Sequence, residues 1–97
     1  MIQQNTKQNI FSHYPEGYMY AGEGVRTVKE FIKFPLEFEK TPNVICSLSG
    51  IDASTKTNIR IDVNVETVTK EGFEVVATTS SDTKIASLNI SWIAISI

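Results

Sequence analysis

The stretch GFEVVATTSSDTKIASLNISWIAI, residues 72–95, decides the fold class of this chain. Two segments rich in Val and Ile flank a polar tip, Ser80-Ser81-Asp82. Strands favour β-branched and aromatic residues, and a polar cluster between two such runs is typical of a turn. The pattern predicts two strands joined as a hairpin. The second strand is apolar on both faces towards its end, which predicts a central strand or one covered by a second subunit.

The residues before this stretch also follow strand patterns. Residues 58–68, NIRIDVNVETV, alternate between apolar and polar side chains almost strictly. The apolar set is Ile59, Ile61, Val63 and Val65, and the polar set is Arg60, Asp62, Asn64 and Glu66. A turn signal at residues 69–72 predicts that residues 72–79 pair antiparallel with this segment. Residues 27–34 fit a helix or a strand, and Pro35 together with the Val, Phe and Ile content favours a strand. Residues 43–52 form a short apolar-rich run that ends in a Gly/Asp/Ser loop. We therefore predict an all-β fold, a small antiparallel sandwich.

Length and composition indicate one globular domain of 97 residues. The net charge of −2 offers no basic face, so we expect no nucleic-acid partner. Apolar runs stay shorter than the ~20 residues of a membrane span, so we expect no membrane insertion. Residues 1–20, rich in Gln, Asn and Tyr, are predicted to be an N-terminal arm or a strand laid against a neighbour, and residues 21–97 the sandwich domain.

Targeting and redox signals are sparse. The N-terminus lacks a charged region followed by an apolar one, so a signal peptide is not expected. We expect a cytoplasmic protein, one exported by a non-classical route, or part of a viral or phage particle. Cys46 is the only cysteine in the sequence, which excludes an internal disulfide and predicts a small buried hydrophobe.

Catalytic chemistry finds little support in the sequence. Ser80, Ser81 and Asp82 would suit a hydrolase, but the only histidine, His13, lies in the arm. Pairing His13 with Cys46 is no better supported. The acidic, His and Cys residues show no metal-ligand spacing, and no glycine-rich phosphate loop is present. We therefore expect no enzyme, no metal site and no cofactor.

Arg60 is open to two interpretations on its pattern alone. It lies on the polar side of a predicted strand, where it could be a solvated charge or a partner of Asp62 and Glu66. Alternatively, its planar fork of donors could bind ligand oxygens. The alternation of apolar and polar residues does not decide between a solvated or ion-paired Arg60 and a ligand-binding one.

Several spaced motifs between about Phe34 and Ile95 together resemble the H-type lectin domain family. They are Pro42-Asn43-Val44, Asn58-Ile59-Arg60, the turn from Val68 to Phe73, Asp82-Thr83 and Ser91-Trp92-Ile93-Ala94. The resemblance implies a six-stranded antiparallel sandwich that forms a trimer, in some members a paired hexamer. It also implies non-catalytic binding of galactose or N-acetylgalactosamine in glycans, in clefts between neighbouring subunits.

The resemblance also assigns residues to a sugar site. The family's ligand arginine falls on Arg60, and its acidic acceptor falls on Glu23, next to Gly22. The Trp-His pair of the snail lectins falls on Ser80 and Ser81, so this chain lacks the aromatic platform. Asp82 would line the cleft, although a side chain of this type beside a threonine more commonly fixes a turn through its backbone. Trp92 fits core or subunit-interface packing better than a sugar platform.

Three interpretations of the serine tip follow. Tyr14, Tyr18 or Tyr20 supplies the missing ring, or the serines bind a different glycan through hydrogen bonds. The third is a structural trimerisation or attachment module, of a surface or phage-like assembly, without a functional sugar site. The absent aromatic pair favours this module, whereas the retained Arg60 favours the lectin.

Overall fold

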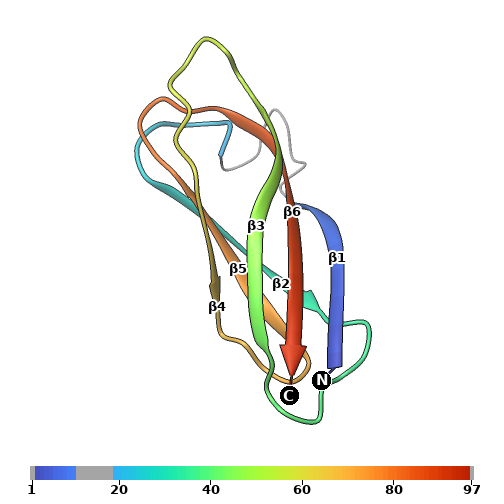
Figure 1. Cartoon of the computed structure of the whole chain (residues 1–97). Helices are drawn as coiled ribbons and strands as arrows, with labels where there is room; N and C mark the ends of the chain where they lie inside the picture. Colours follow the sequence, from blue (N-terminus) through green and yellow to red (C-terminus); the bar gives the residue numbers. More distant parts are fainter. Residues whose placement is uncertain (1, 11–18, 97) are drawn as a thin grey trace.

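The computed structural model describes residues 2–10 and 19–96, which form two three-stranded antiparallel sheets (Figure 1). One sheet has the order β1-β6-β3 and the other the order β2-β5-β4. The strands are β1 (Ile2–Ile10), β2 (Arg26–Lys33), β3 (Asn43–Ala53), β4 (Asp62–Glu66), β5 (Gly72–Thr79) and β6 (Ile85–Ser96). The predicted all-β sandwich is confirmed, and β6 is the central strand of its sheet, as expected.

The core lies between the two central strands, β5 and β6. Alternate residues of β5 point inward, and Phe73, Val75 and Ala77 are completely buried. Leu88 and Ile90 of β6 face them from the other sheet and are equally buried. Period-two alternation places one side of each strand in this layer, and burial of apolar surface is the main force that holds the sheets together.

Four aromatic rings fill one part of this core. The ring of Phe34 lies 5.0 Å from that of Phe38, 5.8 Å from Phe73 and 5.6 Å from Trp92, measured between centroids. Trp92 is 3% exposed, so the prediction that it packs in the core is correct. Its indole nitrogen is buried and has no hydrogen-bond acceptor among the described residues.

The predicted hairpin between residues 72–79 and 84–97 is wrong, although both strands exist. β5 pairs with β2 and β4, whereas β6 pairs with β1 and β3, so residues 80–84 cross from one sheet to the other. Alternation specifies which side of a strand is buried but not which strand lies beside it. The same pattern therefore suits a hairpin and a connection between layers.

The predicted strand over residues 58–68 is shorter in the structure, because β4 begins only at Asp62. Val63 and Val65 are partly buried and their polar neighbours are exposed, as predicted, but Ile59 is 55% exposed. Residues 58–60 bond instead to the threonines at the end of β5 and in the following loop. Those hydrogen bonds replace the sheet ladder that alternation had suggested.

Part of the segment expected to be an arm is a strand of the sandwich's own sheet. β1 pairs antiparallel with β6 from Ile2 opposite Ser96 to Ile10 opposite Leu88. The Gln4 side chain also bonds the backbone of Leu36 in both directions, at 2.8 and 3.1 Å. Backbone pairing needs no apolar alternation, so this polar strand leaves little signal in the sequence. His13, Tyr14 and Tyr18 lie outside the described residues.

Candidate functional site

Three loops meet at one end of the sandwich, at the top of Figure 1, and carry all six predicted site residues. Residues 19–25 precede β2 and contain Gly22 and Glu23. Residues 54–61 join β3 to β4 and contain Arg60. Residues 80–84 join β5 to β6 and contain the serine tip. Because loops from both sheets lie at this end, residues that are far apart in the sequence are neighbours here.

Ser81 connects the crossing loop to the loop of Glu23. Its carbonyl accepts hydrogen bonds from the backbone N–H of Gly24 at 2.9 Å and from the Arg26 guanidinium at 3.1 Å. Its φ of 59° and the φ of 76° at Gly22 lie in the left-handed region, which glycine adopts readily and serine rarely. The loop of Glu23 is therefore held in a tight, defined turn.

Arg26, which the sequence analysis did not single out, organises this turn. Its guanidinium donates to the carbonyls of Gly24 at 3.0 Å, Ala21 at 3.2 Å and Met19 at 3.3 Å, in addition to Ser81. Five donors in a rigid fork suit a cluster of backbone carbonyls. An arginine two residues after a Gly-x-Gly run was the available signal.

Asp82 and Thr83 connect the crossing loop to the loop of Arg60. The Asp82 carboxylate accepts hydrogen bonds from the backbone N–H of Asn58 at 3.3 Å and from its side-chain amide at 3.4 Å. Asp82 thus makes the side-chain-to-backbone bond that was expected, but to a neighbouring loop rather than to its own turn. The carbonyl of Arg60 accepts a hydrogen bond from the Thr79 hydroxyl at 2.5 Å.

Arg60 and Glu23 are both exposed, and within residues 2–10 and 19–96 neither charged group has a hydrogen bond or ion pair. The ion-pair interpretation of Arg60 is not seen, because Asp62 accepts a hydrogen bond from Asn64 and Glu66 lies 3.9 Å from Lys29. The structure therefore places the predicted donor and acceptor on adjoining loops, tied to the same crossing loop, without direct contact between them.

Tyr20 lies at the same end but lines a separate cavity. Lys84 donates from Nζ to the Tyr20 carbonyl at 3.4 Å, and the same ammonium lies 5.4 Å from the centroid of the ring. None of the six predicted site residues lines that cavity. Tyr20 is therefore the one candidate for the missing ring that the described residues place, and it faces a different hollow.

Other chemistries find no support in the part of the chain that the structure describes. No group of three acidic, His or Cys side chains is arranged to hold a metal ion there. No helix with the length and apolar character of a membrane span occurs among these residues either. Burial raises the pKa of the Cys46 thiol, which packs against the core and away from the loop end.

Comparison with known proteins agrees with the fold. The family model of the H-type lectin domain matches residues 29–95. A protein of Fuscovulum blasticum named ATP synthase subunits region ORF 7 is 39% identical over 87 residues, which are 89% of this chain and 76% of that protein. One of the discoidin-1 polypeptides of Dictyostelium discoideum is 36% identical over 74 residues, which are 75% of this chain and 29% of the relative.

Solved structures of discoidin II from Dictyostelium discoideum share the architecture. The native recombinant form superposes with a TM-score of 0.84 at 26% identity, over 96% of this chain and 36% of that chain. The wild-type form gives a TM-score of 0.86 at 25% identity, over 99% of this chain and 36% of that chain. The chain thus spans only about a third of the length of the discoidins that it matches.

Proposed function

The chain belongs to the H-type lectin domain family, whose members are non-catalytic lectins, and we propose that it binds galactose or N-acetylgalactosamine units of glycans at the loop end of the sandwich. Membership itself implies carbohydrate binding and excludes an enzyme reading. We propose in addition which sugar is bound, which residues bind it and how the subunits assemble.

The main support for the proposal is that Arg60 combines a fixed backbone with an exposed guanidinium that is unpaired within the described part of the chain. Its backbone is fixed on both sides, by the Thr83 hydroxyl on the N–H and by the Thr79 hydroxyl on the carbonyl. Its guanidinium nevertheless stays exposed and without a partner among the described residues. A rigid base with a free planar donor is what recognition of sugar hydroxyls requires, because little ordering entropy is lost on binding.

Glu23 supplies the complementary group. The exposed carboxylate stands on a turn that Arg26 and Ser81 hold in place, and it accepts hydrogen bonds only. Adjacent hydroxyls of a pyranose each offer one donor and two acceptor positions. An arginine and a carboxylate can therefore satisfy neighbouring hydroxyls in opposite senses.

Each single site is expected to be weak. Ser80 and Ser81 occupy the positions of the family's aromatic platform, and loss of a buried ring removes about 1–3 kcal/mol of apolar contact. Near a ~1 mM dissociation constant, about −4 kcal/mol, such a loss leaves little measurable binding to an isolated sugar. Useful binding then depends on several sites that act together on one glycan surface.

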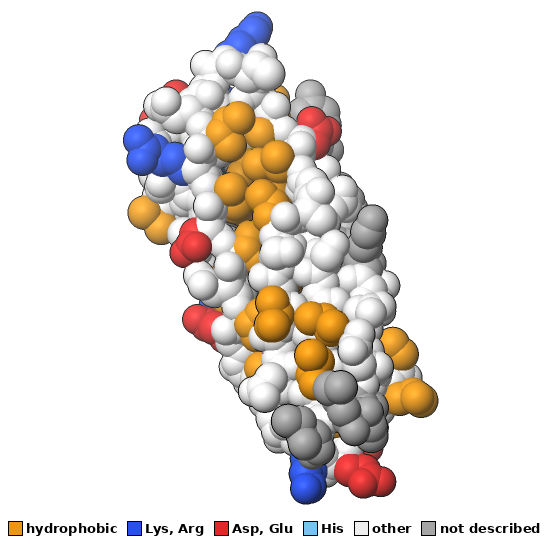
Figure 2. Space-filling view, in the orientation of Figure 1, with side chains coloured by type: hydrophobic (Ala, Val, Ile, Leu, Met, Phe, Trp, Pro, Cys, Tyr) orange, Lys and Arg blue, Asp and Glu red, His pale blue; other side chains and the backbone are white. Residues whose placement is uncertain are grey.

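We propose that a trimer, alone or paired as a hexamer, provides this multivalency. The support is the set of exposed apolar side chains on β3. Leu48 is 37% and Ile51 41% exposed and both lie opposite buried residues of β6, whereas Ile45, opposite Ile93, is 66% exposed on the other side of the strand. Figure 2 shows apolar side chains gathered along this side of the molecule. Exposed apolar side chains gathered on an edge strand in this way commonly mark a protein–protein interface. Burial between subunits would also stabilise a small domain that has no disulfide.

The test is a glycan array probed with the labelled, intact oligomer, repeated with free N-acetylgalactosamine as competitor. Arg60→Ala removes the proposed donor, and Arg60→Lys keeps the charge but loses the planar fork. Lys29→Ala is the control, because it removes an exposed cation from the outer face of β2. We expect both Arg60 variants to lose competitor-sensitive signal while they keep the oligomer, and the control to bind normally.

The second candidate is a trimerisation or attachment module without a sugar site, favoured by the serines at the platform positions. It predicts a blank array from a well-folded oligomer, and disassembly rather than loss of binding in Arg60→Ala. Signal that N-acetylgalactosamine leaves unchanged would keep the lectin function but overturn the proposed sugar preference.

A further inference from the structure

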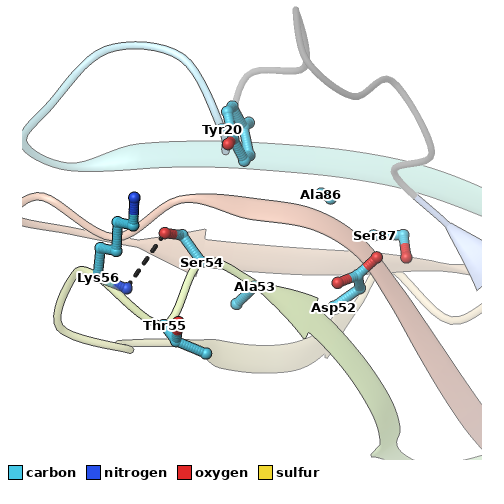
Figure 3. A pocket seen from close by; sticks show the side chains of 8 residues that line it. All are labelled: Tyr20, Asp52, Ala53, Ser54, Thr55, Lys56, Ala86 and Ser87. Carbon is cyan, nitrogen blue, oxygen red and sulfur yellow. Dashed lines mark hydrogen bonds between the residues drawn. The ribbon is translucent and has the colours of Figure 1, made fainter.

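A cavity opens at the loop end, and none of the residues of the proposed function lines it. Its volume is about 520 Å³, within the ~300–1,000 Å³ of small-molecule sites. Figure 3 shows how its walls come from three places: Tyr20 before β2, the end of β3 with its loop, and the start of β6. The full lining is Tyr20, Asp52, Ala53, Ser54, Thr55, Lys56, Ala86 and Ser87.

A β-bulge shapes the floor of this cavity. Asp52 lies opposite Ser87 in the β3–β6 ladder, but Ala53 lies opposite Ile85, so Ala86 is the extra residue on β6. Bulges bend a strand and redirect its side chains. As directly opposed residues, Asp52 and Ser87 project to the same side of the sheet, which sets a carboxylate beside a hydroxyl.

The polar groups of the cavity are mixed and largely free. Within the part of the chain that the structure describes, the Asp52 carboxylate, the Lys56 ammonium and the Ser87 hydroxyl have no hydrogen bond or ion pair. Ser54 Oγ accepts a weak bond from the backbone N–H of Lys56, at 3.3 Å. The site therefore offers an acceptor, a donor and hydroxyls that act as either.

Tyr20 supplies a fixed apolar surface in the same cavity. The Lys84 ammonium is held near the ring through its bond to the Tyr20 carbonyl, so a cation–π contact restricts the ring. An aromatic ring positioned in advance presents contact area at little entropic cost.

This combination selects among ligand classes. A polyanion is disfavoured, because the lining pairs the Asp52 carboxylate with Lys56, and the Lys84 ammonium beside Tyr20 already donates to the Tyr20 carbonyl. A metal ion is disfavoured because no group of three acidic, His or Cys side chains is arranged to hold one among the described residues. A purely apolar ligand would leave the carboxylate and the ammonium desolvated and unpaired, which is costly. A neutral pyranose has hydroxyls for both charged groups and a face of C–H groups for the ring.

We propose that this cavity is a second carbohydrate site, for a neutral hexopyranose, in which Tyr20 contacts the apolar face and Asp52 and Lys56 bind hydroxyls. The site acts independently of Arg60 and Glu23. It gives the loop end of each protomer two places that hold a glycan.

The experiment is amide chemical-shift mapping of the full chain, titrated separately with galactose, N-acetylglucosamine and mannose. At least one sugar is expected to shift the amides of Ser54, Lys56 and Ser87. Asp52→Ala and Tyr20→Ala should weaken that binding at least tenfold, whereas Tyr20→Phe, which keeps the ring, and Arg60→Ala should retain it. Tyr20→Ala removes the ring that Lys84 contacts and so can disturb the loop. Asp52→Ala leaves that contact intact and tests the site independently.

Two results would overturn the inference. One is the absence of shifts at these amides with all of the sugars. The other is shifts that survive Asp52→Ala and Tyr20→Ala, or that disappear in Arg60→Ala, since they would then be relayed from the first site. Failure of the proposed function is separate: it would appear as unshifted Glu23 and Arg60 amides together with a blank array.

Discussion

The buried hydroxyl of Thr83 accepts a hydrogen bond from the backbone N–H of Arg60 at 3.1 Å and donates one to the carbonyl of Asn58 at 2.7 Å. The Thr83 side chain is completely buried, and the two bonds are partly buried. Two residues that are 23 positions apart in the chain are thereby locked together. The arginine that the proposed function depends on is positioned by a residue that does not need to touch the ligand.

Thr83→Val should destabilise the domain by about 1–3 kcal/mol, because it keeps the shape but leaves a partly buried N–H and a partly buried carbonyl without their partner. Urea unfolding followed by tryptophan fluorescence measures this change. Thr83→Ser keeps the hydroxyl and is the matched control. A Thr83→Val variant as stable as the parent would show that Arg60 is held by other contacts.

Arg26→Ala should lower the free energy of unfolding by about 1–3 kcal/mol, because four backbone carbonyls lose a charged donor. Amide hydrogen exchange at Gly24 should also become faster. Lys29→Ala serves as the control, since its ion pair with Glu66, 3.9 Å long and more than half exposed on both sides, is worth about 0–1 kcal/mol. Equal effects of the two substitutions would contradict the role of Arg26.

Gly72→Ala should be strongly destabilising, because the added Cβ would collide with the backbone carbonyl of Ile32 and lie 2.5 Å from the Phe31 ring. Overpacking of this kind costs about 1–3 kcal/mol. Gly50→Ala should cost less, since the nearest atom is the side-chain nitrogen of Asn89, at 3.1 Å. Thermal unfolding of both variants gives the comparison, and the reverse order would refute it.

Trp92→Phe should cost less than about 1.5 kcal/mol, whereas Trp92→Ala should cost about 3–5 kcal/mol. Phenylalanine keeps most of the aromatic packing and removes the buried indole N–H that has no acceptor among the described residues. Urea unfolding followed by circular dichroism measures both without relying on the tryptophan signal. A Trp92→Phe loss close to that of Trp92→Ala would mean that the N–H is satisfied in solution.

The stability of the domain should depend on pH through Cys46. Burial raises the pKa of this thiol above its ordinary value of 9.0, so the folded state retains a proton that the unfolded state releases. The contribution is therefore complete below about pH 9 and is lost as the pH rises through the folded pKa. The stability difference between the parent and Cys46→Ala should shrink above this pH, and a constant difference would contradict the shift.

The strands and the family could be predicted from local information. Val, Ile and Phe at alternate positions identified β5 and β6, because one face of each strand must be apolar to cover the core. Spaced motifs such as Asn58-Ile59-Arg60 identified the family. Asp82 was placed in a loop, where the structure has it, whereas Arg60 was predicted on a strand and lies in the loop before β4.

The pairing of β1 with β6 and the late start of β4 escaped prediction for a physical reason. A polar edge strand such as β1 is held by backbone hydrogen bonds, which every residue type can make, so its sequence carries no apolar period. Residues 58–60 alternate like a strand but bond to threonine hydroxyls instead of a ladder. The functions of Arg26 and Lys84 likewise depend on carbonyls that only the folded chain brings near.

The sequence by itself determined which side of each apolar strand is buried, because that is set by the side chains of the strand alone. Only the tertiary structure decided which strands are neighbours. As a consequence, residues 80–84 cross between the sheets and form hydrogen bonds with the loops of Glu23 and Arg60 at one end. Strand pairing is a relation between distant segments, and backbone hydrogen bonds are the same for every partner. The loop end, with its two proposed sugar sites, is a product of that choice.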